Sequence, residues 1–192
     1  IVKQEDRSEH KDTFREILGD RHDSYLRSIA LHLTRSNAVA IPQRNLRSLV
    51  SDVSKELAIA GQLSANETQP QHLIDALVSH HILVERSDRE GDPVYSFQHQ
   101  QFQEWYASFY VERCIVAAYD APSENNQSKI DEILNAVSWS ESIFFAMERL
   151  SRGTASGVLQ CSRVILRALA IDPMLAALMI RRTSTQVWDN IS

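Results

Sequence analysis

One histidine, His99, stands where a predicted β-strand ends and a long predicted helix begins. The first turn of a helix presents backbone N–H groups that lack a partner within the helix, together with the positive end of the helix dipole, so it attracts anions. No Asp or Glu occurs from Phe97 to Gln103 to occupy such a site from within the chain. An imidazole N–H at His99 is therefore suited to donating a hydrogen bond to a phosphate. The same position also fits a histidine bonded to a nearby carbonyl.

The other histidines and the two cysteines predict neither a metal centre nor a nucleophile. His80 and His81 are adjacent, so on a helix they would diverge by about 100° and could not easily hold one ion with His72. The sequence contains no C-x-x-C and no H-E-x-x-H motif. Cys114 and Cys161 lack the paired histidine that activates a catalytic thiol. We therefore expect no catalytic residues and no metal ligands.

The residues around His99 follow the pattern F-x-H-x-x-F-Q-E, then two aromatic residues and Ala, from Phe97 to Ala107. This pattern resembles the end of the winged-helix domain in NACHT-type STAND NTPases, the nucleotide-switched signalling ATPases that include NLR-like proteins. The resemblance covers roughly residues 25–118. It implies that His99 contacts the phosphates of bound ADP and holds the protein in a closed state. Glu104 matches an acidic position of the family, and its expected role is to fix domain packing.

The resemblance also implies a cofactor and partners that lie outside this chain. The sequence holds no G-x-x-x-x-G-K-[ST] phosphate loop and no run of strands ending in acidic residues for magnesium. We therefore expect no ATP hydrolysis and no cofactor in this segment, and an upstream ATPase domain that binds ADP or ATP with magnesium. The expected partners are that upstream domain and, after ADP is exchanged for ATP, other protomers.

Hydrophobic periodicity predicts a mostly α fold in three parts. Residues 1–20 are expected to contain a polar peripheral helix. Residues 21–121 are expected to form a winged-helix domain with a small β-hairpin and a long C-terminal helix. Its predicted elements are helices over 22–35 (capped by Asp23 or Ser24), from Pro42 to near Gly61 and over Pro70–His81, strands Ile82–Glu85 and Val94–Phe97, and a helix from Gln98 to about Tyr119. Aromatic side chains are expected to tie the hairpin to this helix from within the core: Phe97, Phe102, Trp105 and Tyr106.

Residues 122–192 are expected to form a helical domain after the linker Ala121–Asn126. The predicted helices span about 127–137, 140–151, 156–170 and 173–182, and Asp172 before Pro173 is a suitable N-cap and N1 pair. Short turns favour antiparallel neighbours, either in a helical bundle or at the start of an α-superhelix. The segment Val158–Ile180 is so apolar that we expect part of its surface to be exposed, or covered by a further helix or a second copy.

Composition restricts the remaining classes of function. The chain has 192 residues, 43% hydrophobic content and a net charge of −5. This charge gives no general attraction to nucleic acid or an anionic membrane. No apolar run approaches the ~20 residues of a membrane span. Two cysteines in a helix-rich chain favour a reducing cytoplasm, and a charged start without Met favours a segment of a larger protein with no signal peptide.

A winged-helix transcription regulator with a helical sensing or dimerisation domain is the alternative. A DNA-binding winged helix needs cations on its recognition helix and wing. The predicted recognition helix Pro70–His81 has no Lys or Arg, and Asp75 is its only formal charge. The wing from Glu85 to Asp92 has four acidic and two basic residues, a net charge of −2. Both surfaces should repel a duplex, so we expect no nucleic acid partner.

Overall fold

The structure is a computed structural model that describes residues 21–63 and 69–191. It divides the chain into two compact units, Ile1–Gln103 and Glu104–Ser192. The division falls inside the long helix α5 (Gln100–Asp120), whereas the sequence places the domain boundary at 121/122. The polar helix expected within residues 1–20 lies outside the described residues.

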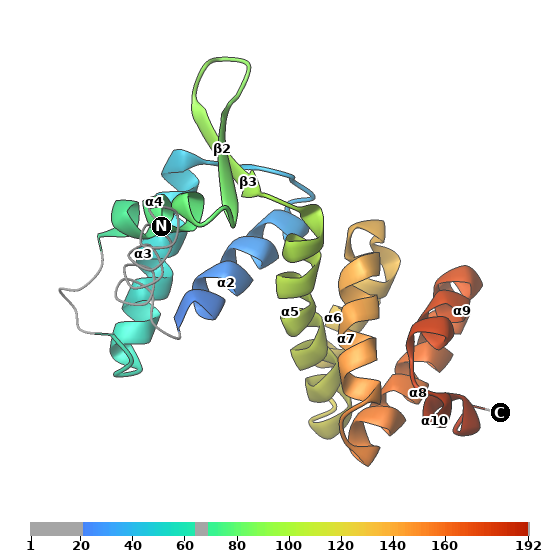
Figure 1. Ribbon diagram of the computed structural model, residues 1–192. Helices are drawn as coiled ribbons and strands as arrows, with labels where there is room; N and C mark the ends of the chain where they lie inside the picture. The colour runs from blue at the N-terminus through green and yellow to red at the C-terminus, as the bar shows by residue number, and fades with distance from the viewer. Residues whose placement is uncertain (1–20, 64–68, 192) are drawn as a thin grey trace, which may run out of the picture. The chain divides into compact units, whose positions relative to one another are not determined.

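The first unit combines helices with a small antiparallel sheet (Figure 1). Its elements are α2 (His22–Arg35), β1 (Ile41–Pro42), α3 (Gln43–Ile59), α4 (Pro70–Ser79), β2 (Leu83–Ser87), β3 (Pro93–Phe97) and the first residues of α5. The sheet order is β1-β3-β2, with Tyr95 of β3 opposite both Ile41 and Glu85. The predicted helix–helix–hairpin arrangement and mostly α fold are therefore confirmed, and β1 is a third strand that the sequence did not indicate.

The core of this unit follows the predicted apolar spacing. On α3 the buried side chains are Leu46, Val50, Val53 and Leu57, a stripe that recurs every three or four residues. At two helix starts a residue plays another role than predicted. Helix α2 spans the predicted residues 22–35, but it begins after Arg21 without the side-chain cap expected from Asp23 or Ser24. Pro42 lies in β1 and directly precedes α3, where its φ of −60° and ψ of 145° are extended rather than helical.

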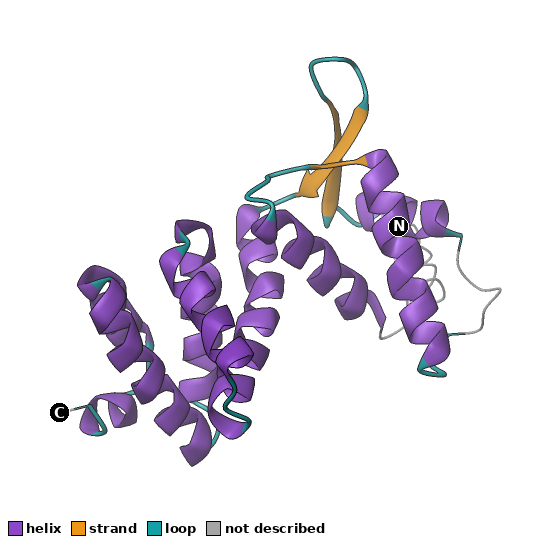
Figure 2. Ribbon diagram, turned by 180° about the vertical axis from the view of Figure 1, so that it is seen from behind, coloured by secondary structure: helices purple, strands orange, loops and turns teal. Residues whose placement is uncertain are grey.

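The second unit is helical throughout its described part (Figure 2). After α5 come α6 (Glu124–Asn135), a 3-10 turn η2 (Val137–Trp139), α7 (Ser140–Ser151), α8 (Ala155–Ile171), α9 (Pro173–Arg182) and α10 (Thr185–Asp189). Helices α7, α8 and α9 pack against one another, and α6 and α10 pack on α8. Helices α6, α7, α8 and α9 correspond to the four helices predicted over about 127–137, 140–151, 156–170 and 173–182.

Side chains cap three of these helices at their N-termini. Ser123 accepts a hydrogen bond from the Asn126 N–H at the start of α6. Thr154 accepts one from the Gly157 N–H at the start of α8. Asp172 accepts hydrogen bonds from the first turn of α9, as predicted.

Within the described residues, none of the helices has both the length and the apolar character needed to cross a bilayer.

Candidate functional site

His99 lies between β3, which ends at Phe97, and α5, which begins at Gln100. The Gln98 N–H donates to the Ile82 carbonyl (2.9 Å), which extends the hairpin pairing to the residue before His99. The His99 carbonyl accepts a hydrogen bond from the Phe102 N–H (3.0 Å) and so takes part in the first turn of α5. The side chain of His99 is exposed. The predicted position of His99, at a helix N-terminus directly after a strand and outside the apolar core, is confirmed.

The start of α5 favours an anion because no carboxylate occupies it from the helix itself. The first turn of α5 contains no acidic residue. The helix runs for 21 residues, so its N-terminus carries the full partial positive charge of a helix dipole. This arrangement suits the imidazole for donating a hydrogen bond to a phosphate oxygen.

A hollow of about 240 Å³ opens beside the start of α5. It lies within the first unit and is lined by the loop before β1, by strands β2 and β3, and by three glutamines: Gln98, Gln100 and Gln103. Arg86 of β2 also lines it. The sequence indicated Arg86 only as part of the wing, because nothing in the spacing shows that β2 returns to the start of α5.

Phe102 corrects the predicted aromatic core. Phe97 is buried, with 5% of its surface exposed, whereas Phe102 is 44% exposed and its ring packs edge-on against the His99 ring at 5.6 Å. Trp105 and Tyr106 are only partly buried. Phe102 lies in the first turn of α5 beside the exposed His99. The prediction from the aromatic spacing that Phe102 belongs to the core is therefore wrong.

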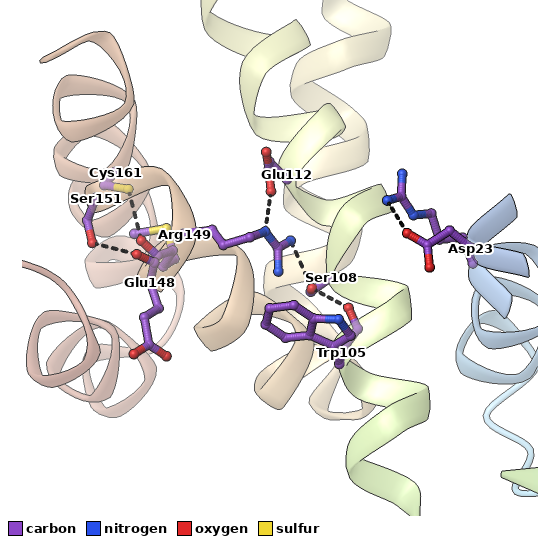
Figure 3. Close-up of polar contacts among 10 residues, drawn as sticks. Asp23, Trp105, Ser108, Glu112, Glu148, Arg149, Ser151 and Cys161 are labelled. Carbon is purple, nitrogen blue, oxygen red and sulfur yellow. Dashed lines mark hydrogen bonds and ion pairs between the residues drawn. The ribbon is translucent and has the colours of Figure 1, made fainter. Parts of the chain in front are cut away.

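A second cluster, centred on Arg149 of α7, lies wholly in the second unit (Figure 3). The Arg149 Nε donates to Glu112 (2.7 Å), and its NH2 group donates to the Ser108 hydroxyl (2.9 Å). The guanidinium also lies over the rings of Trp105 and Phe109, at 4.8 and 4.1 Å from their centroids. Four residues of α5 thus hold one arginine of α7, and the cluster anchors the middle of α5.

In the described part of the chain, His72, His80, His81 and the two cysteines do not gather into a metal-binding group. His72 is exposed on α4, His80 follows the end of α4, and His81 has a φ of 55° in the turn before β2. No three His, Cys, Asp or Glu side chains gather into a possible metal site among the described residues. Both cysteines are buried thiols, and burial raises the pKa of Cys161 to about 12, with a further rise from the Glu112 carboxylate. That thiol stays protonated at neutral pH.

An arginine of the neighbouring helix α3, Arg47, lies on the surface of α4. Arg47 of α3 donates from Nε to the Gln71 side chain (2.7 Å), and Gln71 donates to Asp75 (2.6 Å). At the wing tip, the Asp88 carboxylate accepts from the backbone N–H groups of Glu90 and Asp92, both at 2.9 Å. The acidic character predicted for α4 is therefore reduced by Arg47, while the wing keeps its acidic side chains.

Comparisons with protein-family models, with curated proteins and with solved structures found no match for this chain.

Proposed function

We propose that this chain is the regulatory segment of a NACHT-like STAND NTPase, in which the first unit latches an upstream ADP-bound ATPase domain in its inactive state. The segment itself has no catalytic role. ATPase chemistry, with magnesium, belongs to the upstream domain. Release of the latch on exchange of ADP for ATP would free the protein to assemble with other protomers in the cytoplasm.

The observation that carries this proposal is the exposed His99 side chain at an N-terminus free of acidic residues. The family pattern assigns phosphate contact to this position, and the structure leaves the imidazole available for a contact outside its own core. A hydrogen bond to a charged group contributes roughly 1.5–3 kcal/mol, equivalent to about a 10- to 100-fold change in affinity.

The test compares two histidine variants of the natural protein that contains this segment. After purification and denaturation, the nucleotide released from each protein is quantified. We expect the wild type to retain ADP, His99→Ala to lose most of it and to show higher basal activity, and His72→Ala to retain it. His72 is the matched control because it is an exposed histidine of the same unit that lies on α4.

Equal ADP content in the wild type and in His99→Ala would overturn the latch. The isolated chain of 192 residues supplies an independent arm of the test. We expect it to show no ATP turnover and no ATP affinity tighter than millimolar, because it lacks a phosphate loop. Measurable turnover by the purified chain would show that the segment has a catalytic site of its own.

A further inference from the structure

The outward face of α8 exposes an apolar stripe. Leu159, Arg163, Leu166 and Ala170 follow one another at intervals of four, three and four residues, so they share one face of the helix. Leu159 is 43% exposed and Leu166 is 50% exposed. Leu169, at the edge of this face, is 51% exposed. The opposite face of α8 is buried against the other helices of the second unit.

This stripe lies on a basic part of the second unit. Helices α8 and α9 contain four arginines and no Asp or Glu, in a chain whose net charge is −5. Arg167 is neutralised by Asp131, with its Nε 2.5 Å from Oδ1 and its NH2 group 2.7 Å from Oδ2. Arg182 approaches Glu141 at 3.8 Å. The charge of Arg163, in the middle of the stripe, is met only by the Tyr119 ring at 5.7 Å among the contacts of the described residues.

We propose that the α8 face docks an amphipathic helix of a partner protein that carries acidic side chains beside its apolar stripe. The distance from Leu159 to Ala170 along the helix is roughly 16 Å, three turns, which a partner helix of about 15 residues covers. Leucines of the partner would pack on Leu159, Leu166 and Leu169. A partner carboxylate would pair with Arg163 at the centre, where desolvation strengthens the pair.

The charge and exposure of the α8 face favour an acidic partner helix over a second copy of the chain or a membrane. A symmetric dimer through the same face would set the α8 arginines of one copy against those of the other, because a two-fold interface brings identical patches together. A membrane would require a broad apolar face that can sink into the acyl region. The α8 leucines are only about half exposed and are interrupted by Arg163.

Two synthetic helical peptides with the same leucine stripe provide the test. One carries Glu at its polar positions and the other carries Lys. Each is labelled with a fluorophore and titrated with the chain while fluorescence anisotropy is recorded. We expect the acidic peptide to bind at least tenfold more tightly than the basic peptide. Leu166→Asp should weaken binding of the acidic peptide about tenfold or more.

The charge-reversal variant Arg163→Glu should invert the preference between the two peptides. Its matched control, Arg152→Glu, reverses an arginine that is 68% exposed and lies at the end of α7, outside the α8 face. This control should keep the wild-type preference. Circular dichroism of each variant verifies that the helices are retained.

Four outcomes would overturn the proposal. Two concern the peptides: equal affinity for both, or no binding of either. The other two are a concentration-dependent dimer of the chain and binding of the chain to anionic phosphatidylserine vesicles, if Leu166→Asp abolishes the dimer or the vesicle binding. The dimer would assign the face to a second copy, and vesicle binding would assign it to a membrane surface.

Discussion

At the scale of single residues, Arg149 is the side chain whose loss should cost the second unit most among its partly exposed arginines. It is 23% exposed and joins Glu112, Ser108 and two aromatic rings. Arg149→Ala would leave the Glu112 carboxylate without its partner and remove the packing on both rings. We expect a loss of about 1–3 kcal/mol in the free energy of unfolding, measured by urea denaturation.

Arg152, three residues later, is the control for this prediction. Its pair with Glu148 is an exposed i, i+4 contact at 2.7 Å. Arg152→Ala should change the free energy of unfolding by no more than about 0.5 kcal/mol. Arg149→Lys should fall between the two, because it keeps the charge and loses the planar fork. Equal effects of the two alanine variants would mean that the Arg149 cluster contributes nothing specific.

The Asp131–Arg167 pair predicts a dependence of stability on pH. The hydrogen bonds from Arg167 lower the pKa of the Asp131 carboxyl, against the opposing effect of partial burial. A carboxyl whose pKa is lower in the folded state contributes stability above its unfolded-state pKa, about 4, and loses it as the pH falls through the folded-state value. Asp131→Asn should therefore lose less stability than the wild type below about pH 4, as measured by urea denaturation across this range. Identical pH profiles would contradict the prediction.

At the scale of elements, the turn between α7 and α8 depends on a close approach at Gly157. A Cβ atom at this position would lie 2.4 Å from the backbone carbonyl oxygen of Leu150, which cannot rotate away as a flexible side chain would. Gly157→Ala should therefore force α7 and α8 apart and destabilise the second unit by about 1–3 kcal/mol. Thermal unfolding followed by circular dichroism measures the effect.

Gly153, in the same turn, tests whether the effect comes from the close approach. A Cβ atom there would lie 3.5 Å from the same carbonyl oxygen, an ordinary contact. Gly153→Ala should therefore be neutral, or stabilising by up to about 1 kcal/mol because alanine restricts the unfolded chain. A Gly157→Ala variant as stable as Gly153→Ala would show that the two helices can separate without loss.

Elements with a strong local signal were predictable from the sequence. Pro70 starts α4 and Asp172 caps α9 as expected, because each residue favours its position through its own backbone or side-chain chemistry. The two-residue strand β1 and the five-residue helix α10 were missed, since neither is long enough to show a period. The position of His99 followed from the hairpin pattern.

Contacts between distant segments were not predictable in the same way. Arg149 meets Ser108 across 41 residues, and Arg86 reaches the hollow beside α5 only through the hairpin register. A single sequence contains no signal for such contacts, because Arg149 and Arg86 each look like an ordinary surface arginine in the sequence. The exposure of Phe102 was also not predictable. Its spacing fits an apolar face of a helix, and only the structure shows that this part of the face is not covered by other elements.

At the scale of the whole molecule, charge is distributed unevenly along the chain. Helices α8 and α9 are basic, while the wing and the overall chain are acidic. Both parts that a winged helix would use to read DNA, α4 and the wing, lie in the first unit, and the basic helices lie in the second. Within the first unit the wing keeps its net charge of −2, and α4 supplies no cation of its own beyond the neighbouring Arg47, so both surfaces suit a duplex poorly.

We accordingly expect duplex DNA to bind the chain more weakly than about 10⁻⁴ M at physiological salt, the weak end of non-specific binding. Electrophoretic mobility shifts at low and at physiological salt, with duplexes of random sequence and with duplexes of several defined sequences, measure this affinity. The variant Asp75→Lys, Glu90→Lys makes α4 and the wing more basic and should bind random DNA measurably at low salt, with a steep loss as salt rises. This gain would show that the assay detects binding by these surfaces. Micromolar, sequence-selective binding by the wild type would instead favour a transcription regulator, because specific base contacts would then outweigh the repulsion.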